Sequence, residues 1–75
     1  MTEIEEQVLE SLLEMERAVE GMAGAKTRPD LRPIFERLDR LAQRLPPSTE
    51  PMLLHYLDRK SYQKARVFLQ ELAAR

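Results

Sequence analysis

The chain has 75 residues, with 12 basic and 13 acidic side chains, no cysteine and a formal net charge of -1. A chain of this length forms one small domain at most, and the lack of cysteine excludes disulfides and thiolate metal sites as reinforcement of its core. There is no apolar run near the roughly 18 residues of a membrane span, and glutamates stand where a secretory signal carries positive charge. We therefore expect a single cytoplasmic domain over residues 1–75.

The charges are divided unequally along the chain. Residues 1–25 carry seven acids against one base, whereas residues 26–75 carry eleven bases against six acids. We expect these opposite charges to face each other along helix edges and so to help set how the helices pack. The alternative is a positive surface that binds an anionic partner.

The first predicted helix covers residues 2–23 and begins at Thr2, which has the spacing of a capping box with Glu5. One apolar stripe then continues over about five turns. It consists of Ile4, Val8, Leu12, Met15, Val19 and Met22. At 100° per residue, Leu9 and Leu13 fall roughly 100–140° from the centre of this stripe. They need a second contact, which is either another helix of the chain or a second copy or partner.

A loop over residues 24–29 leads to a second helix at 30–45. Asp30 is its predicted N-cap, because this choice places Pro33 at the third helical position, where proline is tolerated. The apolar residues occupy an arc about 120° wide. They are Leu31, Ile34, Phe35, Leu38, Leu41, Ala42 and Leu45. Charged residues cover the other side, among them Arg37, Arg40 and Arg44.

Two prolines, Pro46 and Pro47, end the second helix. Ser48 or Thr49 is predicted to cap a third helix of about two turns at 49–58. Residues 58–60 then make a turn, and Ser61 caps a fourth helix at 61–74. Since no alternation of period two is present, we expect an all-α bundle of three to four helices, with the first two antiparallel.

The sequence is poor in catalytic residues. The one histidine, His55, is predicted on the polar side of the short third helix, with no base-and-nucleophile pattern around it. One histidine without cysteine does not approach a zinc site, and two glycines are too few for a glycine-rich phosphate loop. We expect no enzyme activity, no cofactor and no metal.

A cluster of basic residues, which we name the basic turn, lies at the start of the fourth helix. It consists of Arg59, Lys60, Ser61 and Lys64. A helix N-terminus favours an anion, so a phosphate, a nucleic-acid backbone or an acidic segment suits this position. The nearest acidic segment is the first helix of the chain itself.

The third and fourth predicted helices also have lengths and a turn that allow a DNA-binding helix-turn-helix. Gln63, Lys64 and Arg66 would then lie near the start of the recognition helix. The turn lacks the usual glycine, and a DNA-binding domain of this size is generally basic overall. Nucleic acid is therefore the less favoured partner.

Residues 52–72 also carry a packing pattern of paired helices. Tyr56, followed by a turn and then by Ala65 and Leu69, resembles the helical hairpin of a tetratricopeptide repeat, in which an aromatic residue of one helix packs on an alanine and an aliphatic residue of the next. The resemblance implies a protein-binding hairpin in which these three residues pack and do not contact the ligand. Leu53 and Leu72 depart from the pattern, because they stand where the repeat prefers small residues.

Together these features predict a small non-enzymatic protein-interaction module or regulatory subunit. Its partner is another protein or a second copy of the chain. Apolar anchors at Leu9 and Leu13 would combine with complementary charge from Arg37, Arg40 and Arg44. The alternative function is phosphate or nucleic-acid binding at the basic turn, with no membrane involved in either case.

Overall fold

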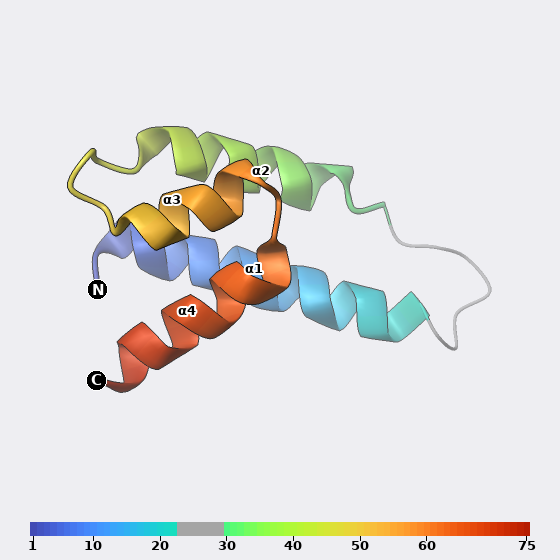
Figure 1. The fold of residues 1–75 in the computed structure, drawn as a ribbon. Coiled ribbons are helices and arrows are strands. Elements are labelled where there is room, and N and C mark those ends of the chain that lie inside the picture. Colours follow the sequence, from blue (N-terminus) through green and yellow to red (C-terminus); the bar gives the residue numbers. More distant parts are fainter. Residues whose placement is uncertain (23–29) are drawn as a thin grey trace.

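The computed structural model describes residues 1–22 and 30–75, and these residues form four α-helices (Figure 1). The helices are α1 (Glu3–Met22), α2 (Arg32–Arg44), α3 (Pro51–Asp58) and α4 (Tyr62–Ala74). Neither of the two described ranges contains a β-strand. The expected all-α bundle is therefore confirmed. The loop predicted at 24–29 and the side chain of Met22 lie outside what the structure describes.

The longest helix, α1, holds the bundle together, since α2 and α4 both pack against it. α1 and α2 run antiparallel, as expected (Figure 1). α3 then reverses the direction again and packs against α4, which returns along α1. The N- and C-termini consequently lie at the same end of the molecule (Figure 1). No described helix has both the length and the low charge needed to cross a membrane.

Ten apolar side chains form one core to which all four helices contribute. They are Val8, Leu12, Ile34, Leu38, Leu41, Leu45, Leu53, Leu57, Ala65 and Leu69. Full burial of one such leucine stabilises the fold by about 1.5–3 kcal/mol. The predicted apolar stripes therefore supply the core.

Among the described side chains of the α1 stripe, Val19 is exposed, at 47%. α1 has 20 residues, whereas α2 and α4 have 13 each. At 1.5 Å per residue α1 is about 10 Å longer than either partner helix. Its last turns extend beyond α4 (Figure 1). Val19 lines an open hollow with Tyr62 and Arg66 of α4, and these side chains do not cover it.

The capping box at the start of α1 is present in the structure. The Glu5 N–H donates to Thr2 Oγ1 at 3.2 Å, and the Thr2 hydroxyl donates to Glu5 Oε1 at 3.0 Å. In the usual box the carboxylate accepts from the backbone N–H of the cap residue; here it accepts from the hydroxyl. The Thr2 carbonyl also accepts from the Glu6 N–H at 3.0 Å.

The predicted N-cap of α2 is wrong by one residue. Leu31 is the N-cap, and its carbonyl accepts from the N–H groups of Ile34 and Phe35, both at 3.1 Å. Asp30 still serves the helix start, because its Oδ1 accepts from the Arg32 N–H at 3.0 Å. The hydrogen bonds from the Arg32 side chain and backbone hold the pKa of Asp30 below its ordinary value. At its other end α2 stops before Pro46, where Leu45 is extended with ψ at 133°, as predicted.

The predicted N-cap of α3 is also wrong. Glu50 is the N-cap and makes no side-chain cap hydrogen bond, while Pro51 takes the first helical position. Proline favours that position, and this preference fixes the cap at the residue before it. The turn closed by the Thr49 N–H to the Pro46 carbonyl, at 2.9 Å, directs Thr49 inward instead. Thr49 is only 6% exposed, and its hydroxyl has no hydrogen-bond partner among the described residues.

Candidate interaction surfaces

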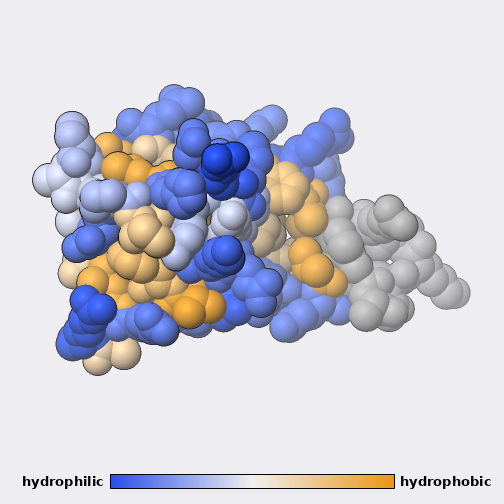
Figure 2. All heavy atoms as spheres, viewed as in Figure 1, coloured by the Kyte–Doolittle hydropathy of each residue, from blue (hydrophilic) through white to orange (hydrophobic). Residues whose placement is uncertain are grey.

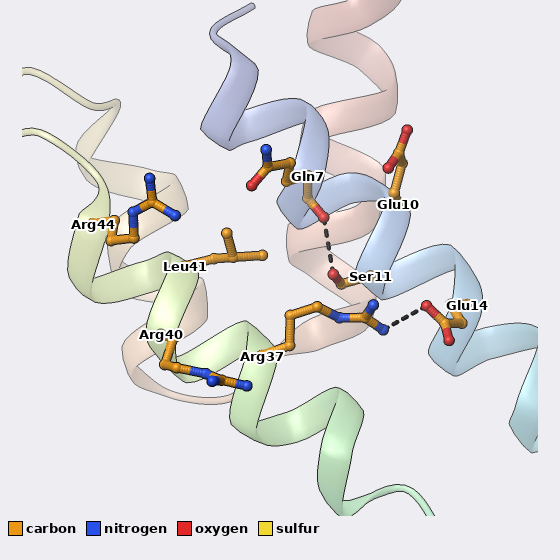
Figure 3. A pocket seen from close by; sticks show the side chains of 8 residues that line it. All are labelled: Gln7, Glu10, Ser11, Glu14, Arg37, Arg40, Leu41 and Arg44. Atoms are coloured by element: carbon orange, nitrogen blue, oxygen red, sulfur yellow. Dashed lines mark hydrogen bonds and ion pairs between the residues drawn. The ribbon is translucent and has the colours of Figure 1, made fainter.

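Three arginines of α2 line a groove between α1 and α2. Arg37, Arg40 and Arg44 stand at positions i, i+3 and i+7, so they project from one side of the helix. The groove has a volume of about 410 Å³. Its other lining residues are Leu41 on α2 and Gln7, Glu10, Ser11 and Glu14 on α1 (Figure 3). We refer to it as the α1/α2 groove.

An ion pair crosses one end of this groove. The Arg37 Nη2 donates to Glu14 Oε2 and so joins α2 to α1 (Figure 3). The Arg37 Nε is buried and has no hydrogen-bond partner in the described part of the chain. Arg37, one of the predicted partner-binding residues, is therefore engaged within the fold.

The other two arginines are free of such partners. Arg40 and Arg44 are exposed, and within residues 1–22 and 30–75 no carboxylate lies at ion-pair distance from either. Figure 3 shows the Glu10 carboxylate directed away from the arginines, whereas the Gln7 side chain extends toward α2. Ser11 is 3% exposed, and its hydroxyl donates to the Gln7 carbonyl at 2.9 Å. The two guanidinium groups on the rim of the groove therefore form no ion pair with a described side chain.

The predicted apolar anchors lie on a different flank of α1. With 3.6 residues per turn, Leu9 and Leu13 stand within about 60° of Glu16 but about 100–140° from Glu14. Glu16 faces α4, because its Oε2 pairs with Arg66 Nε at 3.0 Å. Leu9 is half-buried and packs against the core, and Leu13 is half-buried. The structure thus does not join the leucines and the arginines into one surface.

The basic turn is built on a helix C-terminal motif. The Ser61 N–H donates to the Tyr56 carbonyl at 2.7 Å, and the Lys60 N–H donates to the Leu57 carbonyl at 3.1 Å. This is the Schellman arrangement, in which the residue after the C-cap is usually a left-handed glycine. Lys60 takes that place with φ at +57°. The glycine expected of a tight turn is therefore replaced by a strained lysine.

The charges of the basic turn lie close to α2. The Lys60 Nζ is 3.7 Å from Asp39 Oδ1 of α2, so its partner is not a glutamate of α1. Arg59 and Lys64 are exposed. Ser61 is the N-cap of α4, as predicted, but its side chain makes no cap hydrogen bond.

Of the three residues that would read DNA in a helix-turn-helix, Arg66 packs toward α1, whereas Gln63 and Lys64 are exposed. The Arg66 Nε pairs with Glu16, and its Nη1 donates to Gln70 Oε1 at 2.9 Å. The Arg66 side chain is consequently only 21% exposed. Together with Arg37–Glu14 and Lys60–Asp39, this pair shows that opposite charges do face each other along the helix edges, as expected.

The helices α3 and α4 pack against each other as a hairpin. Ala65 and Leu69 are fully buried, and the Tyr56 ring meets Phe68 edge-on with ring centroids 6.4 Å apart.

His55 is exposed, as predicted. Hydrophobic residues reach the surface over α4 (Figure 2), where Val67 is 42% exposed.

The sequence interpretation missed the α1 wall of the groove. Gln7, Ser11 and Glu14 share the side of α1 that faces α2, and none of them belongs to the apolar stripe. The charge pattern could have indicated this wall, because antiparallel packing of an acidic helix on a basic one places glutamates opposite arginines. No group of three or more possible metal ligands occurs among the residues that the structure covers.

Comparisons of the chain with protein-family models, with curated proteins and with solved structures found no significant match. The arrangement of its own side chains is therefore the basis for a functional proposal.

Proposed function

We propose that the chain is a small, non-enzymatic interaction module that binds a protein partner in the cytoplasm through the α1/α2 groove. One observation carries the proposal: Arg40 and Arg44 stand together on the exposed rim without a counter-ion in the described chain. A guanidinium offers a planar fork of donors that matches a carboxylate, which suits it to partner recognition.

No ion pair among the described residues uses these two arginines. The core residues Ile34 and Leu38 of α2 lie on another side of the helix, whereas Leu41 lines the groove beside the arginines. Like charges four residues apart, as in Arg40 and Arg44, cost an isolated helix roughly 0.2–0.5 kcal/mol. A negatively charged partner would remove that cost, so the pair favours a bound state over the free chain.

Self-association is a second form of the same function. Leu13 is half-buried and lies on the flank of α1 away from the arginines. If a second copy docks there, Leu13→Glu converts a dimer to a monomer, as measured by sedimentation equilibrium. An unchanged mass in Leu13→Glu excludes this form and leaves the groove proposal intact.

Affinity capture with a tagged chain in its native cell tests the main proposal. The double variant Arg40→Gln/Arg44→Gln removes two charges at the groove, and Arg32→Gln/Arg75→Gln removes two exposed charges elsewhere. We expect mass spectrometry to show loss of the partner only with the first variant. If both variants retain the same partners as the native chain, the groove is not the binding surface.

The second candidate function is anion binding at the basic turn. It is favoured by the exposure of Arg59 and Lys64 beside a Ser61 side chain that makes no cap bond. Phosphate binding weakens steeply as salt rises. We expect Arg59→Gln/Lys64→Gln to elute earlier from a heparin column if this function holds, and to elute with the native chain if it does not.

A further inference from the structure

The spacing of Arg40 and Arg44 defines the ligand that the α1/α2 groove can hold. They are four positions apart on the α-helix, which corresponds to a rise of about 6 Å along the axis. In an extended peptide, side chains at i and i+2 project to the same side and stand about 6.6 Å apart. Two carboxylates on such a segment match the two arginines in their spacing along α2 and in charge.

We propose that the α1/α2 groove recognises a short acidic peptide segment with carboxylates at i and i+2, one on Arg40 and the other on Arg44. This inference rests on the proposed function and names the chemistry of the partner's docking element. The Gln7 amide extends from α1 toward α2 (Figure 3) and supplies a neutral donor to the segment. Leu41, which is buried in the core, closes the floor of the groove.

The groove has an end that limits the segment to two seated carboxylates. At Arg37 the guanidinium already donates to Glu14, so a third carboxylate there would meet a negative charge of the chain itself. Recognition is therefore of a spaced pair and not of a long acidic run.

The α1 wall disfavours a polyphosphate chain. Glu10 and Glu14 line the groove, and exposed Glu3 and Glu6 lie on the same helix. Duplex DNA carries about one charge per 1.7 Å of axis, so it could not avoid these carboxylates. Two separate carboxylates can be seated on α2 alone.

A second copy of the chain also fits the groove poorly. Leu41 is the one apolar side chain among the residues that line the groove. Homodimer interfaces are typically about 65% apolar. The unpaired positive charges on the rim thus favour a short acidic segment over a second copy with the same charges.

An NMR titration of the full ¹⁵N-labelled chain at low salt tests the proposal. The probe is the end-blocked peptide Gly-Glu-Ser-Glu-Gly, and the matched probe is Gly-Gln-Ser-Gln-Gly. We expect the acidic peptide to shift the amides of Gln7 and residues 40–44, and the neutral peptide to bind at least about 10-fold more weakly. Arg44→Gln should weaken binding by about 10-fold, whereas Arg32→Gln should leave it unchanged. Each variant's own spectrum reports whether it is folded.

Four results would overturn the inference. They are equal binding of the two peptides, no loss with Arg44→Gln, shifts centred on the basic turn, and tighter binding of Gly-phosphoserine-Ser-phosphoserine-Gly. Concentration-dependent shifts of the same amides without peptide, together with a dimer mass, would instead assign the groove to a second copy. If cellular capture depends on Arg40 and Arg44 but the peptide does not bind, the proposed function stands and this inference fails.

Discussion

Lys60 has a left-handed backbone conformation that is unfavourable for a residue with a side chain. Its φ of +57° lies in the left-handed region, which costs a non-glycine residue roughly 1–2 kcal/mol. Its ion pair with Asp39 joins two exposed groups and offsets less than about 1 kcal/mol of that cost. Lys60→Gly should therefore raise the free energy of unfolding by about 1 kcal/mol, measured by urea denaturation.

The neighbouring Arg59 supplies the control, because its φ of -83° is ordinary helical geometry. Arg59→Gly should lower the free energy of unfolding by about 0.5–1 kcal/mol. If both glycine variants destabilise the chain, the strain assigned to Lys60 is not present.

Thr49 is a buried residue whose hydroxyl has no hydrogen-bond partner among the described residues. Its hydroxyl makes no hydrogen bond within the described residues, and a buried unsatisfied group costs about 1–3 kcal/mol. Thr49→Val keeps the shape and removes the hydroxyl, so thermal unfolding should show a gain of about 1 kcal/mol. Thr49→Ser keeps the hydroxyl and loses a methyl group, so it should be destabilising by about 1 kcal/mol. A loss of stability in Thr49→Val would mean that the hydroxyl is satisfied in solution.

At the scale of helices, the contact between α1 and α4 depends partly on the pair Glu16–Arg66. Arg66 is the least exposed cation of the ion pairs, so its coupling with Glu16 should reach the upper part of the range of about 0.2–1 kcal/mol for surface pairs. A double-mutant cycle with Glu16→Gln and Arg66→Gln measures this coupling. The same cycle on Asp39 and Lys60, which are more exposed and 3.7 Å apart, should give a smaller value. Equal couplings would show that burial does not strengthen the α1–α4 pair.

The start of α2 should show a pH dependence of known sign. Hydrogen bonds from Arg32 lower the pKa of Asp30, so this carboxylate favours the folded state above its ordinary pKa and loses that effect only as pH falls through the lowered value. Arg32→Gln should raise the pKa of Asp30 toward its ordinary value, as read from a carboxyl NMR titration. A titration midpoint that does not move would contradict the assigned hydrogen bonds.

The sequence predicted the helices because local chemistry determines them. Pro46 ends α2, and the apolar stripes supply the buried residues of all four helices. It failed where tertiary placement decides the outcome. Thr49 has the chemistry of a cap, yet the preceding turn buries it. Val19 continues a regular stripe, yet it is exposed in an open hollow beside Tyr62 of α4.

The whole molecule shows why the candidate surface could be predicted only in part. The arginines of α2 were identified from charge and spacing, and Arg40 and Arg44 are exposed as a binding role requires. The prediction that the arginines form one surface with Leu9 and Leu13 is wrong, because those leucines lie on the flank of α1 that faces α4. Periodicity gives the angle between residues on one helix; it does not tell which neighbouring helix covers each side.

The central claim, that a partner binds at the α1/α2 groove, is tested most directly by mapping the partner's footprint on the chain. Amide shifts of the ¹⁵N-labelled protein are recorded with the partner obtained by affinity capture. The account predicts the largest changes at Gln7, Ser11 and residues 37–45. Changes centred instead on residues 59–64, or on Leu9 and Leu13, would contradict it.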